Sequence, residues 1–264
     1  MMKYFFNILI FFFITCFMSN IHSQKLGFEV DNNKGTIDNI FLKNNQIIFE
    51  IDSKSNKIKN IYVFSNQSNA DRFLTNPIFD LKPRRKMELH KGVNLYIDTY
   101  TNVDYAKNFT DNVRAEIVGS IVQIDEIKIE YFKRIGQNST IGIVGDLKSV
   151  NGIPISYHIN YSENQRAGYT GKLEKIGNTT FKYHNLHRNS EAANYVGKIK
   201  EIGTVKINYN EDYSANVNKG FVGKIKNIGN VNFNYFKNTY NNNASGITGK
   251  FQSITGTDNR FIIY

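Results

Sequence analysis

The segments GKLEKIGNTTFKY (residues 171–183), GKIKEIGTVKINY (197–209) and GKIKNIGNVNFNY (223–235) are copies of one pattern. Each begins with a glycine that recurs every 26 residues, at Gly119, Gly145, Gly171, Gly197, Gly223 and Gly249. A constant period of this length indicates a repeat architecture, in which every copy folds as the same supersecondary unit. Residues 113–264 are therefore predicted to form six copies of one unit.

Apolar residues occur at regular positions within each copy. With the glycine as position 0, the columns at −2, +2, +5, +10 and +12 are apolar with one exception, and +12 is always tyrosine or phenylalanine. Alternation with a period of two is typical of β-strands. Isoleucine, phenylalanine and tyrosine are also favoured in strands. Each copy is expected to be two strands joined by a turn.

The turn is expected at positions +4 to +6, because +6 is Gly, Asn or Asp in five of the six copies, and these residues tolerate a positive φ. A three-residue loop with such a residue in third place would pair Leu173 with Thr179, and Ile225 with Val231. In this register the repeated glycine lies inside the first strand, where the +12 ring can cover it. The alternative is that the glycine marks a β-bulge.

Two all-β architectures fit a constant 26-residue period. One is an antiparallel β-hairpin array, in which successive hairpins lie side by side. The other is a β-solenoid with one coil per copy. The distinct turn signal in the middle of each copy favours the array.

Residues 24–112 lack the period and are expected to be a separate β-rich region. Strands are expected at 46–52, 59–64 and 93–99, and a short helix or an ordered loop at 70–79. The basic cluster at residues 83–86 is expected to be a solvated loop. A sheet with one apolar face must cover that face. Either the array therefore rolls onto itself or the N-terminal region packs against it.

Residues 1–23 are predicted to be a signal peptide. Lys3 precedes an apolar run over 4–17, a polar stretch follows, and cleavage is expected near Ser23. A retained anchor and a lipid-bearing Cys16 are the alternatives. The mature chain has no cysteine, which excludes disulfides, thiolate metal sites and a cysteine nucleophile. It also has no further apolar run long enough to span a bilayer. The protein is therefore expected in the periplasm, at the cell surface or in the medium.

The formal net charge is +10. The basic residues are spread along the chain, so no nucleic acid is expected as a partner, whereas an anionic glycan or a cell-envelope component would suit such a protein. The candidate surface-binding residues are lysines at positions +1 and +3: Lys172, Lys198, Lys200, Lys224, Lys226 and Lys250. The alternative is that these lysines form the solvated face of an antiparallel sheet.

No sequence motif points to catalysis, since the chain has no nucleophile elbow, phosphate-binding loop or dinucleotide fingerprint. His184 and His187 lie where a strand ends and have no third ligand nearby, so no metal or cofactor is expected. The expected function is that of an exported structural or adhesive protein without enzymatic activity. The alternatives are a binding module for an anionic glycan or envelope surface, and a hydrolase whose N-terminal half carries a site with His90 or Asp98.

The units GKIKEIGTVKINY and GKIKNIGNVNFNY resemble those of uncharacterised exported bacterial proteins with G-K-[IL]-x-x-I-G β-hairpin repeats. The resemblance covers residues 113–264. It implies a β-rich exported array and brings no activity with it.

Overall fold

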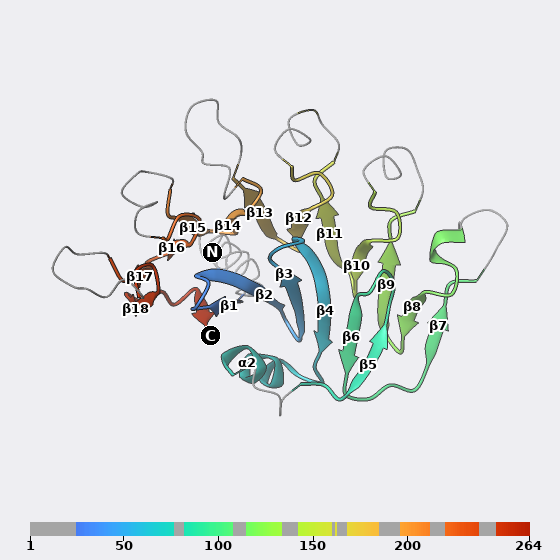
Figure 1. The fold of residues 1–264 in the computed structure, drawn as a ribbon. Coiled ribbons are helices and arrows are strands. Elements are labelled where there is room, and N and C mark those ends of the chain that lie inside the picture. Colours follow the sequence, from blue (N-terminus) through green and yellow to red (C-terminus); the bar gives the residue numbers. More distant parts are fainter. Residues whose placement is uncertain are drawn as a thin grey trace, which may run out of the picture.

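Two β-sheets make up the structure, a computed structural model (Figure 1). It describes residues 25–76, 82–107, 115–133, 142–159, 162, 168–184, 196–211, 220–237 and 247–264. We call the seven-stranded sheet the N-terminal sheet and the twelve-stranded sheet the array. In Figure 1 the array arches around the N-terminal sheet.

The N-terminal sheet has the strand order β19-β1-β2-β3-β4-β6-β5. Its strands are β1 (Lys25–Asp31), β2 (Thr36–Asn44), β3 (Ile47–Asp52), β4 (Lys57–Val63), β5 (Arg85–Glu88), β6 (Asn94–Ile97) and β19 (Phe261–Ile263). Strands β1 to β4 form an antiparallel meander, whereas β6 runs parallel to β4 and β19 runs parallel to β1. Strand β19 thus forms one edge of the N-terminal sheet, next to β1.

The array contains its strands in chain order, each antiparallel to the next. They are β7 (Val103–Tyr105), β8 (Ile121–Ile124), β9 (Ile127–Tyr131), β10 (Leu147–Val150), β11 (Ile153–Tyr157), β12 (Leu173–Ile176), β13 (Thr179–Tyr183), β14 (Ile199–Ile202), β15 (Val205–Tyr209), β16 (Ile225–Ile228), β17 (Val231–Tyr235) and β18 (Phe251–Thr255). A short 3-10 helix, η2 (Ala115–Ile117), precedes β8. This topology confirms the all-β hairpin array and not the solenoid.

The hairpin loops have two residues rather than the expected three. Ile176 pairs with Thr179, and Ile228 with Val231, so the predicted pairing of Leu173 with Thr179 and of Ile225 with Val231 is wrong. The loop residue Gly177 has φ 57°, which suits the tight two-residue turn that matches strand twist. The alternation failed as a guide to register because each first strand contains a β-bulge.

The bulge explains why two residues three positions apart both face the core. Tyr183 pairs with Ile199 and Lys182 with Glu201, which leaves Lys200 as an extra residue. An extra residue reverses the side-chain parity of a strand. The apolar residues at +2 and +5, such as Ile199 and Ile202, are therefore both buried.

The recurring glycine forms a turn before the first strand and does not lie within it. Gly171 has φ 77°, and the N–H of Lys172 donates to the carbonyl of Tyr169 at 3.0 Å. A positive φ at the third of four residues but not at the second is typical of a type II turn, which favours glycine there. The N–H of Gly171 also donates to the carbonyl of His158 in the preceding copy. Neither the ring-over-glycine role nor the bulge at the glycine is therefore correct.

The array packs against the N-terminal sheet, which was one of the two expected solutions. A single apolar cluster joins Phe28, Phe49 and Ile61 of the first sheet to Ile202 and Ile228 of the array, all fully buried. Burial of each such side chain contributes about 1.5–3 kcal/mol.

The opposite face of the N-terminal sheet is covered by the helix α2 (Gln67–Thr75). Its Phe73 and Leu74 pack on Phe41 and Ile48. Its first turn is capped by Asn66, whose Oδ1 accepts the N–H of Asn69 at 2.8 Å. A helix was one of two structures expected in this region, and residues 77–81 lie outside the described part of the chain.

The two sheets do not divide at the expected boundary between residues 112 and 113. Strand β7 belongs to the array although it precedes the boundary. In the sixth copy only β18 joins the array, and the chain then turns at Gly256 (φ 87°) towards β19. The basic cluster at residues 83–86 runs into the edge strand β5, where exposed charges discourage pairing with another chain. Strands β1, β2 and β5 had not been predicted.

Within the described ranges, no helix has both the length and the apolar character needed to cross a bilayer.

Candidate functional site

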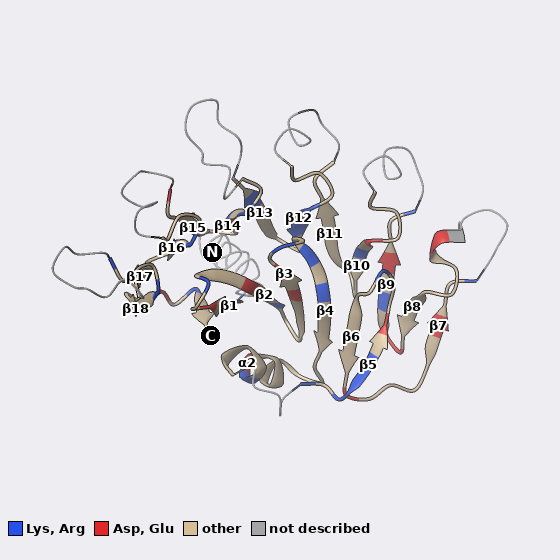
Figure 2. Cartoon of the chain, in the orientation of Figure 1, with Lys and Arg blue, Asp and Glu red and all other residues tan. Residues whose placement is uncertain are grey.

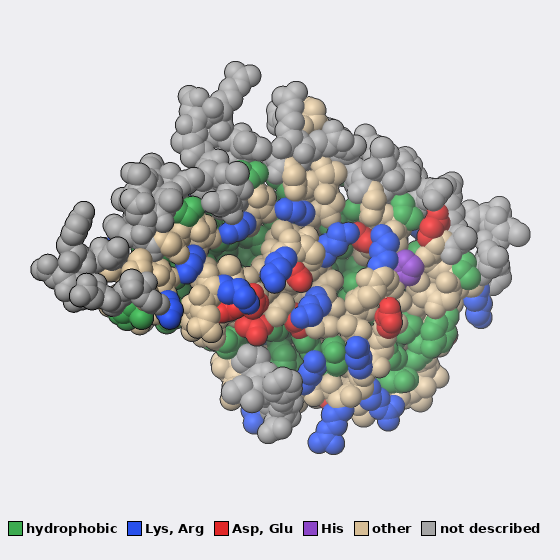
Figure 3. All heavy atoms as spheres, viewed as in Figure 1, with side chains coloured by type: hydrophobic (Ala, Val, Ile, Leu, Met, Phe, Trp, Pro, Cys, Tyr) green, Lys and Arg blue, Asp and Glu red, His purple; other side chains and the backbone are tan. Residues whose placement is uncertain are grey.

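Three turns at one end of the N-terminal sheet dock onto the array. They are the β1–β2 turn (residues 32–35), the β3–β4 turn (53–56) and the β5–β6 segment (89–93). We call the zone of contact the junction. Figure 3 shows Lys and Arg side chains spread over the face where the two sheets meet, with Asp and Glu among them.

Each docked turn has a contact in a different odd-numbered copy of the repeat. His90 Nδ1 lies 3.0 Å from Ser120 Oγ in the first copy. The carbonyl of Asn56 accepts the N–H of Leu173 in the third copy at 3.2 Å. The carbonyl of Gly35 accepts the N–H of Ile225 in the fifth copy at 2.9 Å. The second copy is contacted as well, since Lys91 of the β5–β6 segment lies 2.8 Å from Asp146. A cavity lies beside each of the second and fourth copies.

The cavity at the second copy contains its own ion pairs. It has a volume of about 260 Å³, and Asp146 at position +1 lies at its wall. The carboxylate of Asp146 is 3.1 Å from Lys57 Nζ and 2.8 Å from Lys91 Nζ. Because Asp146 is only 8% exposed, two ammonium partners compensate the loss of its hydration.

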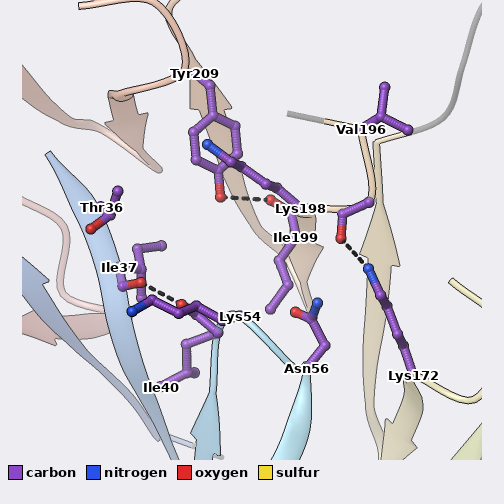
Figure 4. A pocket seen from close by; sticks show the side chains of 12 residues that line it. Thr36, Ile37, Ile40, Lys54, Asn56, Lys172, Val196, Lys198, Ile199 and Tyr209 are labelled. Atoms are coloured by element: carbon purple, nitrogen blue, oxygen red, sulfur yellow. Dashed lines mark hydrogen bonds between the residues drawn. The ribbon is translucent and has the colours of Figure 1, made fainter. Parts of the chain in front are cut away.

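The cavity at the fourth copy has a volume of about 250 Å³ and a different lining (Figure 4). Its walls are Thr36, Ile37, Ile40, Ser53, Lys54, Asn56, Lys172, Val196, Gly197, Lys198, Ile199 and Tyr209. These described residues include three lysines and no carboxylate. In Figure 4, Lys54 extends from the β3–β4 turn beside Ile37, and Lys198 lies beside Tyr209.

Asn56 at the wall of this cavity has an unpaired polar atom. The residue is 2% exposed, and its side-chain Oδ1 has no hydrogen-bond partner. Its backbone adopts φ 54°, and its carbonyl is held by Leu173. Figure 4 shows the amide directed towards Ile199. A buried amide oxygen without a donor costs about 1–3 kcal/mol.

Three of the six candidate binding lysines serve to link the copies. The ammonium groups of Lys172, Lys198 and Lys224 donate to the carbonyls of the glycines that begin the next copies, at 2.7, 2.8 and 2.5 Å. They also lie over the rings of the +12 tyrosines at 5.4, 4.9 and 5.4 Å from the centroid. Loss of hydration on burial lowers the pKa of all three amines.

The +12 tyrosines connect the two strands of a hairpin through their side chains. In four copies their hydroxyl donates to the +2 carbonyl of the same copy: Tyr131 to Ile121, Tyr183 to Leu173, Tyr209 to Ile199 and Tyr235 to Ile225. We call this contact the tyrosine clamp. The +13 side chain of one copy packs against the next +12 ring, as His158 does on Tyr183 at 5.5 Å.

The other candidate lysines are exposed. Lys200 and Lys226 lie on the outer face of the array, and Lys250 belongs to the sixth copy. Strands β8 to β17 carry seven exposed lysines: Lys128, Lys148, Lys175, Lys182, Lys200, Lys206 and Lys226. Figure 2 marks the positions of Lys and Arg along the ribbon. Three glutamates share this face, and Glu130 and Glu201 already pair with Lys148 and Lys182.

The residues considered for catalysis are not brought together. His90 precedes β6 and Asp98 follows it, so the strand separates them. His90 contacts the hydroxyl of Ser120, but Ser120 is only 4% exposed and the nearby Asp146 is occupied by lysines. Burial, and then the charge of Lys91, lower the pKa of His90. His184 packs against Tyr209, and His187 lies outside the described residues.

No group of three or more possible metal ligands occurs among the described residues. The cavity residues Thr36, Lys54 and Asn56 were missed from the sequence, because turn residues carry no signal for the distant repeat on which they dock. Comparison of the chain with protein-family models, with curated proteins and with solved structures gave no match.

Proposed function

We propose that this chain is an exported structural or adhesive protein without catalytic activity. The observation that supports this role is that the repeated residues serve the architecture. Position 0 makes the turn, position +1 links neighbouring copies, and position +12 closes the hairpin. Repetition of the same face suits contact with an extended partner, whereas catalysis needs unlike residues converging in one pocket.

An adhesive role through an anionic polymer is favoured by the charge of the outer face. Seven exposed lysines share it with three glutamates, so positive charge is in excess over five consecutive hairpins. Exposed charges interact weakly one at a time, but a polymer contacts many together. The partner class that fits is an acidic glycan or an anionic component of the cell envelope.

Binding to dextran sulfate, with neutral dextran as the comparison, tests this proposal. Affinity for dextran sulfate should fall steeply between about 0.05 and 0.5 M salt as screening increases. The double variant Lys200→Gln/Lys226→Gln should bind about fivefold more weakly, since each exposed pair contributes up to about 1 kcal/mol. The matched control, Arg84→Gln/Lys86→Gln, removes the same charge from the start of the edge strand β5 and the residue before it, and should change the affinity little.

Equal losses in the two double variants, or binding that does not depend on salt, would contradict a specific role of the outer face. A hydrolysis screen with glycan, ester and peptide substrates addresses the absence of catalysis. Turnover that disappears in His90→Ala would overturn that part of the proposal.

A further inference from the structure

The cavity at the fourth copy differs in one chemical respect from its counterpart two copies earlier. At the second copy, position +1 is Asp146, whose carboxylate lies between Lys57 and Lys91. At the fourth copy, position +1 is Lys198, and the turn supplies a further lysine, Lys54. The first cavity therefore contains basic groups and two acids, Asp52 and Asp146, whereas the second contains basic groups and no acid.

The ammonium groups at the fourth copy retain donors for a ligand. Lys172 and Lys198 each give one hydrogen bond to a glycine carbonyl, and an ammonium group has three donors. Lys54 is exposed at the rim. An anion placed here would also restore the electrostatic stabilisation that the two half-buried amines lose on leaving water.

The other residues of the cavity wall restrict the ligand further, beyond its charge. The unpaired Oδ1 of Asn56 requires a hydrogen-bond donor. A cationic donor would be repelled by the lysines, so a neutral donor such as a hydroxyl group fits. Ile37, Ile40 and Ile199 provide an apolar wall suited to the C–H face of a sugar ring. The volume of about 250 Å³ is large enough for one ring of this kind.

We propose that this cavity binds one acidic sugar residue of the hexuronate type, with its carboxylate at Lys54 and Lys198 and a hydroxyl at Asn56. The site lies at the junction and is separate from the outer face of the array. The ligand supplies the carboxylate that Asp146 supplies at the second copy.

Titration calorimetry of the full chain with glucuronate tests the site, with glucose and acetate as comparisons. Glucuronate should bind with a dissociation constant on the order of 1 mM, as suits a small polar ligand. Glucose lacks the charge and acetate lacks the hydroxyl donor, so each should bind at least about tenfold more weakly.

Two variants locate the binding. Lys54→Gln should weaken glucuronate binding by about threefold to tenfold. Asn56→Asp keeps the side-chain shape, tolerates the positive φ, and places a carboxylate where the ligand would bind, so binding should be lost. Lys86→Gln on β5 is the control for charge. Thermal unfolding of each variant establishes that it is folded.

Several results would overturn the site. These are no heat of binding for glucuronate up to about 10 mM, equal affinity for glucose, or undiminished binding in folded Asn56→Asp. Measuring both ligands in both variants distinguishes this site from the outer face of the array. Lys54→Gln should leave dextran sulfate binding unchanged, and Lys200→Gln/Lys226→Gln should leave glucuronate binding unchanged.

Discussion

Removal of the tyrosine clamp is the perturbation that most directly tests how the array is held together. The variant Tyr183→Phe/Tyr209→Phe/Tyr235→Phe keeps three buried rings and removes three hydroxyls. Each hydroxyl donates to a carbonyl of its own hairpin at 2.7, 3.2 and 2.8 Å, respectively. Only the hydrogen bonds change, so the packing of the core is retained.

The expected loss follows from the net value of one hydrogen bond, about 1 kcal/mol. Neighbouring clamps are two strands apart, about 9.6 Å, so their contributions should add to about 3 kcal/mol. For a protein of this size, 1 kcal/mol shifts the melting temperature by about 2–4 °C, which gives a total decrease of about 6–12 °C.

The corresponding triple alanine variant should behave differently, because it also removes the rings. Each buried aromatic residue changed to alanine costs about 3–5 kcal/mol. Three such losses total about 9–15 kcal/mol, which is comparable to the whole stability of a typical domain, about 5–15 kcal/mol. This variant should show no cooperative unfolding transition.

Thermal unfolding followed by circular dichroism, together with urea unfolding, measures both effects. Tyr105→Phe is the matched control, since Tyr105 lies in the outermost strand β7 and is 52% exposed. An unchanged melting temperature in the triple phenylalanine variant would refute the clamp. A decrease in Tyr105→Phe as large as one third of the triple effect would show that the loss does not come from the buried hydroxyls.

Three further changes test other elements of the fold. Burial lowers the pKa of His158, so the unfolded chain takes up a proton first as the pH falls below about 6.5, and stability is lost in acid. His158→Phe, which places there the residue found at the equivalent Phe132, should reduce the decrease in melting temperature between pH 7 and 5. Gly223→Ala forces alanine into φ 74° and should cost about 1–2 kcal/mol, measured by urea unfolding. Hydrogen bonds from Arg260 hold the pKa of Asp258 well below its usual range, so Asp258→Asn should lower the melting temperature at pH 7, and the difference should shrink only below about pH 4.

The repeat period was sufficient to predict the hairpin array, but not its register. The apolar columns at +2 and +5 are three residues apart, and strict alternation cannot place both on one face. A β-bulge at Lys200 resolves this conflict, and its presence could have been inferred from that spacing. The position of the turn was mispredicted for the same reason. Without a bulge, a three-residue loop is required to place all the apolar columns on one face of the hairpin.

The role of the +1 lysines could not be read from one copy. Lys198 belongs to the fourth copy, but its ammonium group binds the carbonyl of Gly223 in the fifth. A lysine that alternates with buried residues has the pattern expected for the solvent-exposed face of a sheet. No neighbouring residue in the sequence indicates that it contacts the next copy. The glycine carbonyl becomes its acceptor only because the type II turn places successive copies in register.

The cavities lie where the turns of the N-terminal sheet meet the repeating hairpins of the array. Neighbouring turns of the N-terminal sheet dock on the first, third and fifth copies of the array, through His90, Asn56 and Gly35. The two cavities lie at the second and fourth copies. The β5–β6 segment also contacts the second copy, through Lys91 and Asp146. This spacing belongs to the fold and does not depend on the residue at position +1. That residue sets part of the charge of each cavity: Asp146 pairs with Lys57 and Lys91 in the first, whereas Lys198 adds positive charge to the second. An array built from near-identical units thus acquires a chemically unique position where a non-repetitive sheet meets it.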